Sequence, residues 1–162
     1  MRPIDPALVD EVWRETIAYP PGRVDAEAEV FLARQPHVAA FARSATEGRD
    51  DTVQTAALGL AFLLFKILER SLGQPFPTVT EARLREASDT MASRLGHVPE
   101  EVAVGRLRSA VDAEHPTLVS HMLSVFYGDD AGHSDYDGDV RASLLLLLRT
   151  LSDALDVGPV NA

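Results

Sequence analysis

The stretch AALGLAFLLFKIL, residues 56–68, decides the fold because it is apolar almost all the way round a helix. A helix of this kind is usually surrounded by other helices, since no side of it suits water. Asp50 or Asp51 is placed to cap its start, and Gly73 follows its predicted end. We therefore expect a central apolar helix over about residues 51–72.

The chain before this stretch has the apolar spacing of helices, without the alternation typical of strands. Asp5 can cap a first helix that has Pro6 at its first position. Asp25 is predicted to cap a second helix, which Pro36 ends or kinks. Helical segments are therefore expected up to Gly48.

The chain after residue 73 continues in the same pattern. Thr78 and Glu81 have the capping-box spacing and predict the start of a helix that Gly96 ends. Three further helices are predicted: from Pro99 to the break at His115-Pro116, from Pro116 to Tyr127, and from Asp139 as N-cap to just before Gly158. The expected fold class is all-α, a single compact domain (1–162) of about seven helices in an irregular bundle around the central helix.

Composition excludes several classes of function. The chain has 162 residues, 46% of them hydrophobic, a formal net charge of −10 and no cysteine. The lack of cysteine excludes disulfides, cysteine-ligated zinc, iron–sulfur clusters and thiol nucleophiles. The acidic balance disfavours nucleic acid and anionic membrane surfaces as partners, because phosphate binding needs a basic surface.

Other features point to a soluble cytoplasmic protein. The N-terminus, MRPIDPALVDEVW, has no apolar run of signal-peptide length. The most apolar stretch, residues 53–68, is shorter than the roughly 20 residues that a membrane span needs. One lysine beside fourteen arginines is typical of a GC-rich bacterial genome.

The stretch YGDDAGHSDYDGDV, residues 127–140, resembles a calcium loop in its density of aspartates. If Gly138 takes the sixth position of an EF-hand loop, His133 falls at the first and Leu144 at the twelfth, so the strongest ligand is missing. The stretch is then a solvated loop, or an irregular calcium or magnesium site whose candidate ligands are Asp135, Asp137 and Asp139. Tyr136, among these carboxylates, is a candidate contact for a partner.

One sequence pattern occurs twice: Arg83-Leu84-Arg85-x-Ala87-x-Asp89 recurs as Arg106-Leu107-Arg108-x-Ala110-x-Asp112. In each copy the leucine is expected to face inward, and the second arginine can pair with the aspartate four residues later. The two copies are either similar amphipathic helices or the walls of an arginine-lined groove for an acidic peptide or a phosphate-bearing ligand. The groove residues would be Arg83, Arg85, Arg106 and Arg108.

Catalytic motifs are not recognised in the sequence. His115 and His121 are six residues apart, which puts them on different sides of a helix, and Pro116 interrupts the backbone between them. Glu-x-x-His, the spacing of carboxylate-bridged metal bundles, does not occur. Gly59 inside the central helix predicts either a closely crossing helix or a ligand pocket. Phe76 and Tyr19, next to proline-rich turns, are expected to be partly exposed.

The leading functional hypothesis is a non-catalytic protein-interaction or regulatory module that can self-associate, with an unidentified protein or a second copy as partner and no cofactor. Leucines occupy residues 144–148, and five adjacent positions cover every side of a helix, so at least one should point away from the core. The alternatives are a binder of a small apolar ligand near Gly59 and a metal-dependent enzyme that uses acidic residues with His115 or His121.

Overall fold

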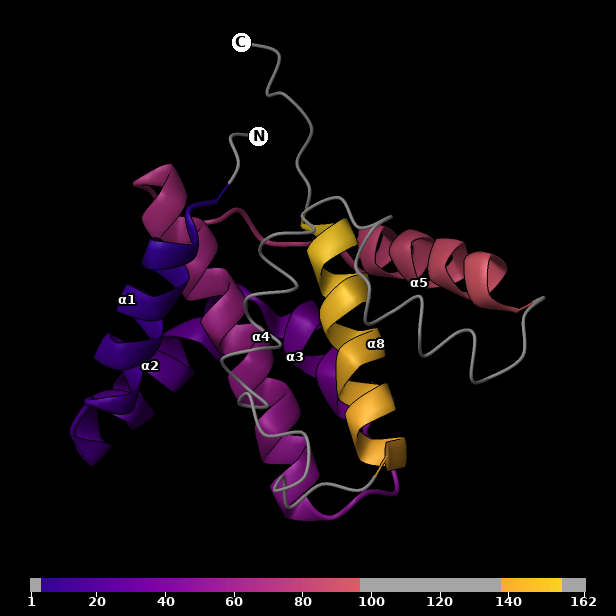
Figure 1. The fold of residues 1–162 in the computed structure, drawn as a ribbon, viewed down its shortest axis with the longest axis horizontal. Helices are drawn as coiled ribbons and strands as arrows, with labels where there is room; N and C mark the ends of the chain where they lie inside the picture. The colour runs from indigo at the N-terminus through magenta and orange to yellow at the C-terminus, as the bar shows by residue number, and fades with distance from the viewer. Residues whose placement is uncertain (1–3, 97–137, 156–162) are drawn as a thin grey trace, which may run out of the picture.

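The structure is a computed structural model, and it describes residues 4–96 and 138–155 (Figure 1). These residues are mostly helical and contain no strand. They form six helices: α1 (Pro6–Ile17), α2 (Pro21–Arg34), α3 (Pro36–Ala45), α4 (Asp51–Leu72), α5 (Glu81–Leu95) and α8 (Gly138–Ala154). The all-α prediction is confirmed for this part of the chain, and the helices predicted between Pro99 and Tyr127 lie outside it.

Two helices begin at the positions that their N-cap residues predicted. The Asp5 carboxylate accepts a hydrogen bond from the backbone N–H of Ala7 at 2.9 Å, and Pro6 takes the first helical position of α1. For α4 the structure selects Asp50, whose carboxylate accepts a hydrogen bond from the N–H of Val53 at 3.0 Å. These caps satisfy N–H groups that have no partner inside the helix.

The predicted start of α2 at Asp25 is wrong. The helix begins at Pro21, with Pro20 as its N-cap, and Asp25 lies inside its first turns. A proline at the first helical position already has the backbone φ angle of a helix and lacks only an N–H that would be unpaired there. The turn that ends α1 therefore also starts α2.

The predicted capping box of α5 is also wrong. The N-cap is Thr80, whose hydroxyl accepts a hydrogen bond from the N–H of Arg83 at 3.2 Å. Thr78 instead donates to the backbone carbonyl of Arg34 at 3.0 Å and ties the connector to the end of α2. Similarly, Asp139, the predicted N-cap of the last helix, lies within the first turn of α8.

The core forms where α4 and α8 meet their neighbours. α4 packs against α1, α3 and α8, while α8 also packs against α3 and α5 (Figure 1). Apolar side chains from both helices share one cluster, including Leu60, Leu64 and Ile67 of α4 and Leu144, Leu148 and Leu151 of α8. Nine of the 22 residues of α4 are buried, on more than one side of the helix.

The length of α4 corrects one argument from the sequence. With 22 residues, it is long and apolar enough to cross a membrane by length and composition, in contrast to the shorter stretch considered above, and no other helix in the described residues passes that test. Half of its most apolar window is buried within the protein. The core helix of a soluble protein meets the same criteria.

The expectation of partial exposure is wrong for Phe76 and is met by Tyr19. Phe76 is buried, and its ring lies 5.4 Å from that of Phe65 in an edge-to-face arrangement, whereas partial exposure was expected. Tyr19 is half-buried. Either a closely crossing helix or a ligand pocket was expected at Gly59, and a Cβ atom built there meets no atom of the described structure within 4 Å. Gly59 is exposed.

Candidate functional site

Of the predicted groove residues, Arg83 connects α5 to the end of α8. Leu84 beside it is buried, as predicted. The Nε of Arg83 donates to the carbonyl of Ala154 at 3.2 Å, and its Nη2 donates to the carbonyl of Asp153 at 3.4 Å. The last carbonyls of a helix have no partner inside it and carry its negative dipole end, so a guanidinium there is stabilising. Arg83 therefore has a structural role.

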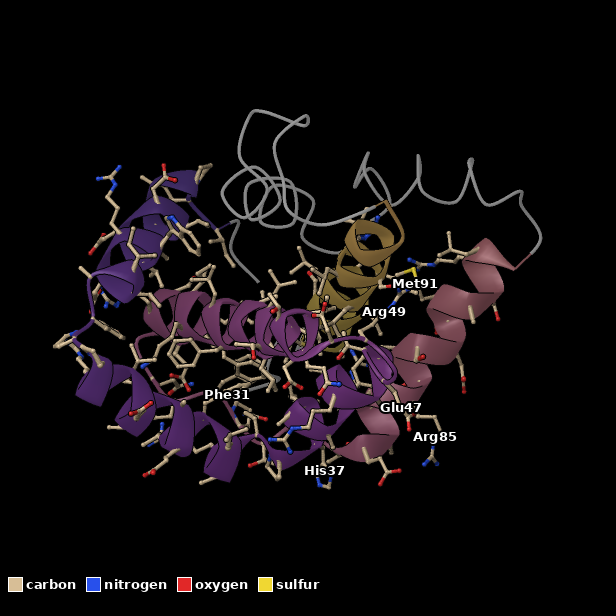
Figure 2. The ribbon with its side chains drawn as sticks, turned by 90° about the horizontal axis from the view of Figure 1, so that it is seen from below. Phe31, His37, Glu47, Arg49, Arg85 and Met91 are labelled. Carbon is tan, nitrogen blue, oxygen red and sulfur yellow. The ribbon has the colours of Figure 1, made fainter. Side chains whose placement is uncertain are left out.

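Arg85 points the other way. It is exposed on the outer side of α5 (Figure 2). Its guanidinium donates to the Glu81 carboxylate at 2.6 Å, four residues earlier, while the predicted pair was with Asp89. The two arginines of the first repeat thus do not converge on one groove.

Most of the other candidates lie outside the described residues. These are Arg106, Arg108, Asp135, Tyr136, Asp137, His115 and His121. Asp139 is placed by its backbone alone, at the start of α8. Within residues 4–96 and 138–155, no group of three or more histidine, aspartate or glutamate side chains is arranged to hold a metal ion.

The leucine run on α8 follows the expectation from helix geometry. Leu144, Leu147 and Leu148 are buried in the main core cluster. Leu145 packs against Met91 of α5 in a second cluster, and Figure 2 shows Met91 between the two helices. Leu146 is 40% exposed. One leucine of the five therefore points away from the core of the chain.

A charged cleft lies between α1, α2 and α4, and it was not predicted from the sequence. Its volume is about 330 Å³. Three carboxylates and three cations line it, so its formal charge sums to zero. The lining residues are Val12, Glu15, Tyr19, Arg23, Glu27, Lys66, Glu69, Arg70 and Gly73.

Several ion pairs join helices across this cleft. Arg70 of α4 bonds Glu15 of α1 at 2.6 Å and contacts Glu11 at 3.4 Å. The hydrogen bond that Arg70 donates to Glu15, and then the negative charge of Glu15, raise the pKa of Arg70. Lys66, the one lysine of the chain, pairs with Glu27 of α2. A basic group whose pKa is raised on folding loses its stabilising contribution only at pH above its unfolded pKa, so Arg70 stays charged at any ordinary pH.

Arg23 is held differently from the other two cations. Its guanidinium carbon lies 4.1 Å from the centre of the Tyr19 ring, which is the arrangement of a cation–π contact. Its nitrogens lie 3.8 Å from Glu15 and 3.9 Å from Glu27, both too long for hydrogen bonds. Within the described structure, the N–H groups of Arg23 are thus not committed to a protein acceptor.

A smaller, apolar cavity adjoins the cleft. It shares Glu27, Lys66 and Glu69 with the cleft, and aromatic rings from α2 and α4 line its interior. Phe31 packs edge-to-face on Phe62, with ring centres 5.8 Å apart, and lies 5.5 Å from Phe65. The cavity volume is about 40 Å³, enough for a few water molecules.

The cleft was missed because its contacts are long-range. Lys66 and Glu27 are 39 positions apart, and Arg70 and Glu15 are 55 apart. One clue was present: the lone lysine interrupts the end of the most apolar stretch, where a charge needs a partner. The sequence does not reveal which carboxylate that partner is.

Comparison with known proteins found no matching family model, no matching curated protein and no matching solved structure.

Proposed function

We propose that the chain is a non-catalytic protein-interaction module that self-associates through the outer face of α8. The observation that carries this proposal is the exposure of Leu146, at 40%, in a run whose other four leucines are at most 4% exposed. Full burial of a leucine side chain contributes roughly 1.5–3 kcal/mol. Because Leu146 is partly exposed in the single chain, about 1 kcal/mol of this stabilisation is missing. Burial of Leu146 against a second surface would provide it.

A second copy is the partner that this proposal names first. Most soluble homo-oligomers are two-fold dimers, in which the same surface is used by both subunits. Each subunit then contributes its own Leu146, so a small exposed area counts twice.

We propose one domain, residues 1–162, of about seven helices around α4, in the cytoplasm of a bacterium. The half-buried apolar window of α4 supports a core helix. The net charge of −10 supports a role away from nucleic acids and anionic membranes.

The alternative of a small apolar ligand is less well supported by the cavities described. The cavity lined by Phe31, Phe62 and Phe65 holds about 40 Å³, whereas ligand pockets usually span about 300–1,000 Å³. Gly59 lines neither this cavity nor the charged cleft. A metal-dependent reaction would rest on His115 or His121, which the structure does not describe.

Static light scattering at several protein concentrations tests the proposal. Self-association predicts an average mass that rises with concentration above the 17.6 kDa of one chain. A folded protein with a constant mass of one chain over the whole range would contradict it.

A further inference from the structure

We infer that the cleft between α1, α2 and α4 is a binding site for a small organic carboxylate that carries an apolar or aromatic group. Arg23 and Lys66 would bind the carboxylate. This site is separate from the α8 surface proposed for self-association.

The cleft is large enough for a small molecule, and one of its walls is loosely packed. Its volume of about 330 Å³ is at the lower end of the range of roughly 300–1,000 Å³ for sites that bind small molecules. α2, which forms one wall, has a single buried side chain, Phe31, in a helix of 14 residues. A wall with so few buried contacts can adjust to a ligand at little cost.

Two of the three cations that line the cleft have N–H donors that can bind a ligand. Arg23 lies over Tyr19 with its N–H groups beyond hydrogen-bond distance of any acceptor in the described structure. Lys66 has three N–H donors and its hydrogen bond goes to Glu27. Arg70, in contrast, already bonds Glu15. The unused donors therefore belong to Arg23 and Lys66, and a planar carboxylate suits a guanidinium fork.

The carboxylates that line the cleft limit the negative charge that a ligand can carry. Glu15, Glu27 and Glu69 also line it, so the cations there are balanced before any ligand arrives. A single negative charge meets less repulsion from these carboxylates than the double charge of a phosphate ester. The cleft thus favours a monoanion.

The cleft also offers apolar surface to a ligand. Val12 and the Tyr19 ring belong to the lining of the cleft. The ammonium of Lys66 lies 5.6 Å from the centre of the Phe62 ring, at the boundary with the cavity that Phe31 and Phe65 line. A ring or short alkyl group can bury area on these surfaces, which a bare inorganic anion cannot do.

The lone lysine allows a direct test. Protein labelled with ¹³C-lysine gives one Cε signal, from Lys66, which reports on this cleft alone. Titration with benzoate is expected to shift that signal to saturation, while uncharged benzamide does not. Arg23→Gln should weaken benzoate binding by about tenfold or more, because a hydrogen bond to a charged group is lost. Arg85→Gln, at an exposed arginine on α5, should leave the binding unchanged.

Three results would overturn the inference. These are a Lys66 signal that benzoate does not move, equal binding by wild type and Arg23→Gln, or a shift by inorganic phosphate at lower concentration than by benzoate. Arg23→Gln removes a half-exposed side chain, and an unchanged melting temperature would show that the variant is folded.

Discussion

The side chain of Gln35 is bound to the backbone of Val79, 44 residues later in the chain. Its Oε1 accepts a hydrogen bond from the N–H of Val79 at 2.9 Å, and its Nε2 donates to the carbonyl of Pro77 at 2.9 Å. Gln35 is 2% exposed and lies between α2 and α3. One buried amide therefore fixes the connector that leads from α4 to α5, and it explains why Phe76 is buried.

Gln35→Ala should lower the free energy of unfolding by about 2–3 kcal/mol. The change removes the side-chain hydrogen bonds of Gln35 and leaves the buried N–H of Val79 without an acceptor, which costs roughly 1–3 kcal/mol by itself. Urea unfolding measures the effect. Gln54→Ala is the matched control, since Gln54 makes one exposed hydrogen bond to Arg49 and should change stability by less than about 0.5 kcal/mol. Equal effects of the two variants would contradict the role assigned to Gln35.

Phe31→Ala should destabilise the protein by about 3–4 kcal/mol, because Phe31 is the one buried side chain of α2 and packs on Phe62 and Phe65. Figure 2 shows Phe31 between α2 and α4. Val30→Ala, one residue away and 48% exposed, should cost less than about 1 kcal/mol. Thermal unfolding of both variants checks this, and a small loss for Phe31→Ala would mean that α2 is held mainly by its ion pairs.

Substitution of alanine at Gly59, inside α4, and at Gly73, just after its end, should have opposite effects. Gly59→Ala should raise the free energy of unfolding by up to about 1 kcal/mol, because alanine is the better helix former and a Cβ atom there meets nothing within 4 Å in the described structure. Gly73→Ala should lower it by about 1 kcal/mol, because Gly73 ends the helix with φ of +69°. Calorimetry distinguishes the two. Destabilisation by Gly59→Ala would show that a further segment or a partner packs closely against this position.

The parts of the fold that sequence predicted well depend on local interactions. Asp50 and Gly73 bound α4 through contacts within a few residues, so their types and positions were sufficient. The errors arose where two local signals competed. Pro21 preceded Asp25 as a helix start, and Thr80 replaced Thr78 because Thr78 bonds a residue 44 positions away.

The candidate site could not be predicted in the same way. Helix periodicity correctly gave one outward leucine, which is Leu146, but it carries no information on which helices become neighbours. The cleft depends on that information, since Arg23, Lys66 and Glu15 come from three helices. Arg83 was a candidate for a ligand groove for the same reason, and the carbonyls that it bonds lie 70 and 71 residues later.

Sedimentation equilibrium of Leu146→Gln beside the wild type tests the proposed self-association most directly. Gln keeps the helix while removing the apolar contact, and in a two-fold dimer the loss occurs twice. We expect a wild-type mass that approaches twice 17.6 kDa with rising concentration, at least about tenfold weaker association for Leu146→Gln, and no change for the control Val24→Gln, whose side chain is 47% exposed on α2. A wild-type chain that stays at 17.6 kDa, or a Leu146→Gln variant that associates as strongly as wild type, would contradict the account.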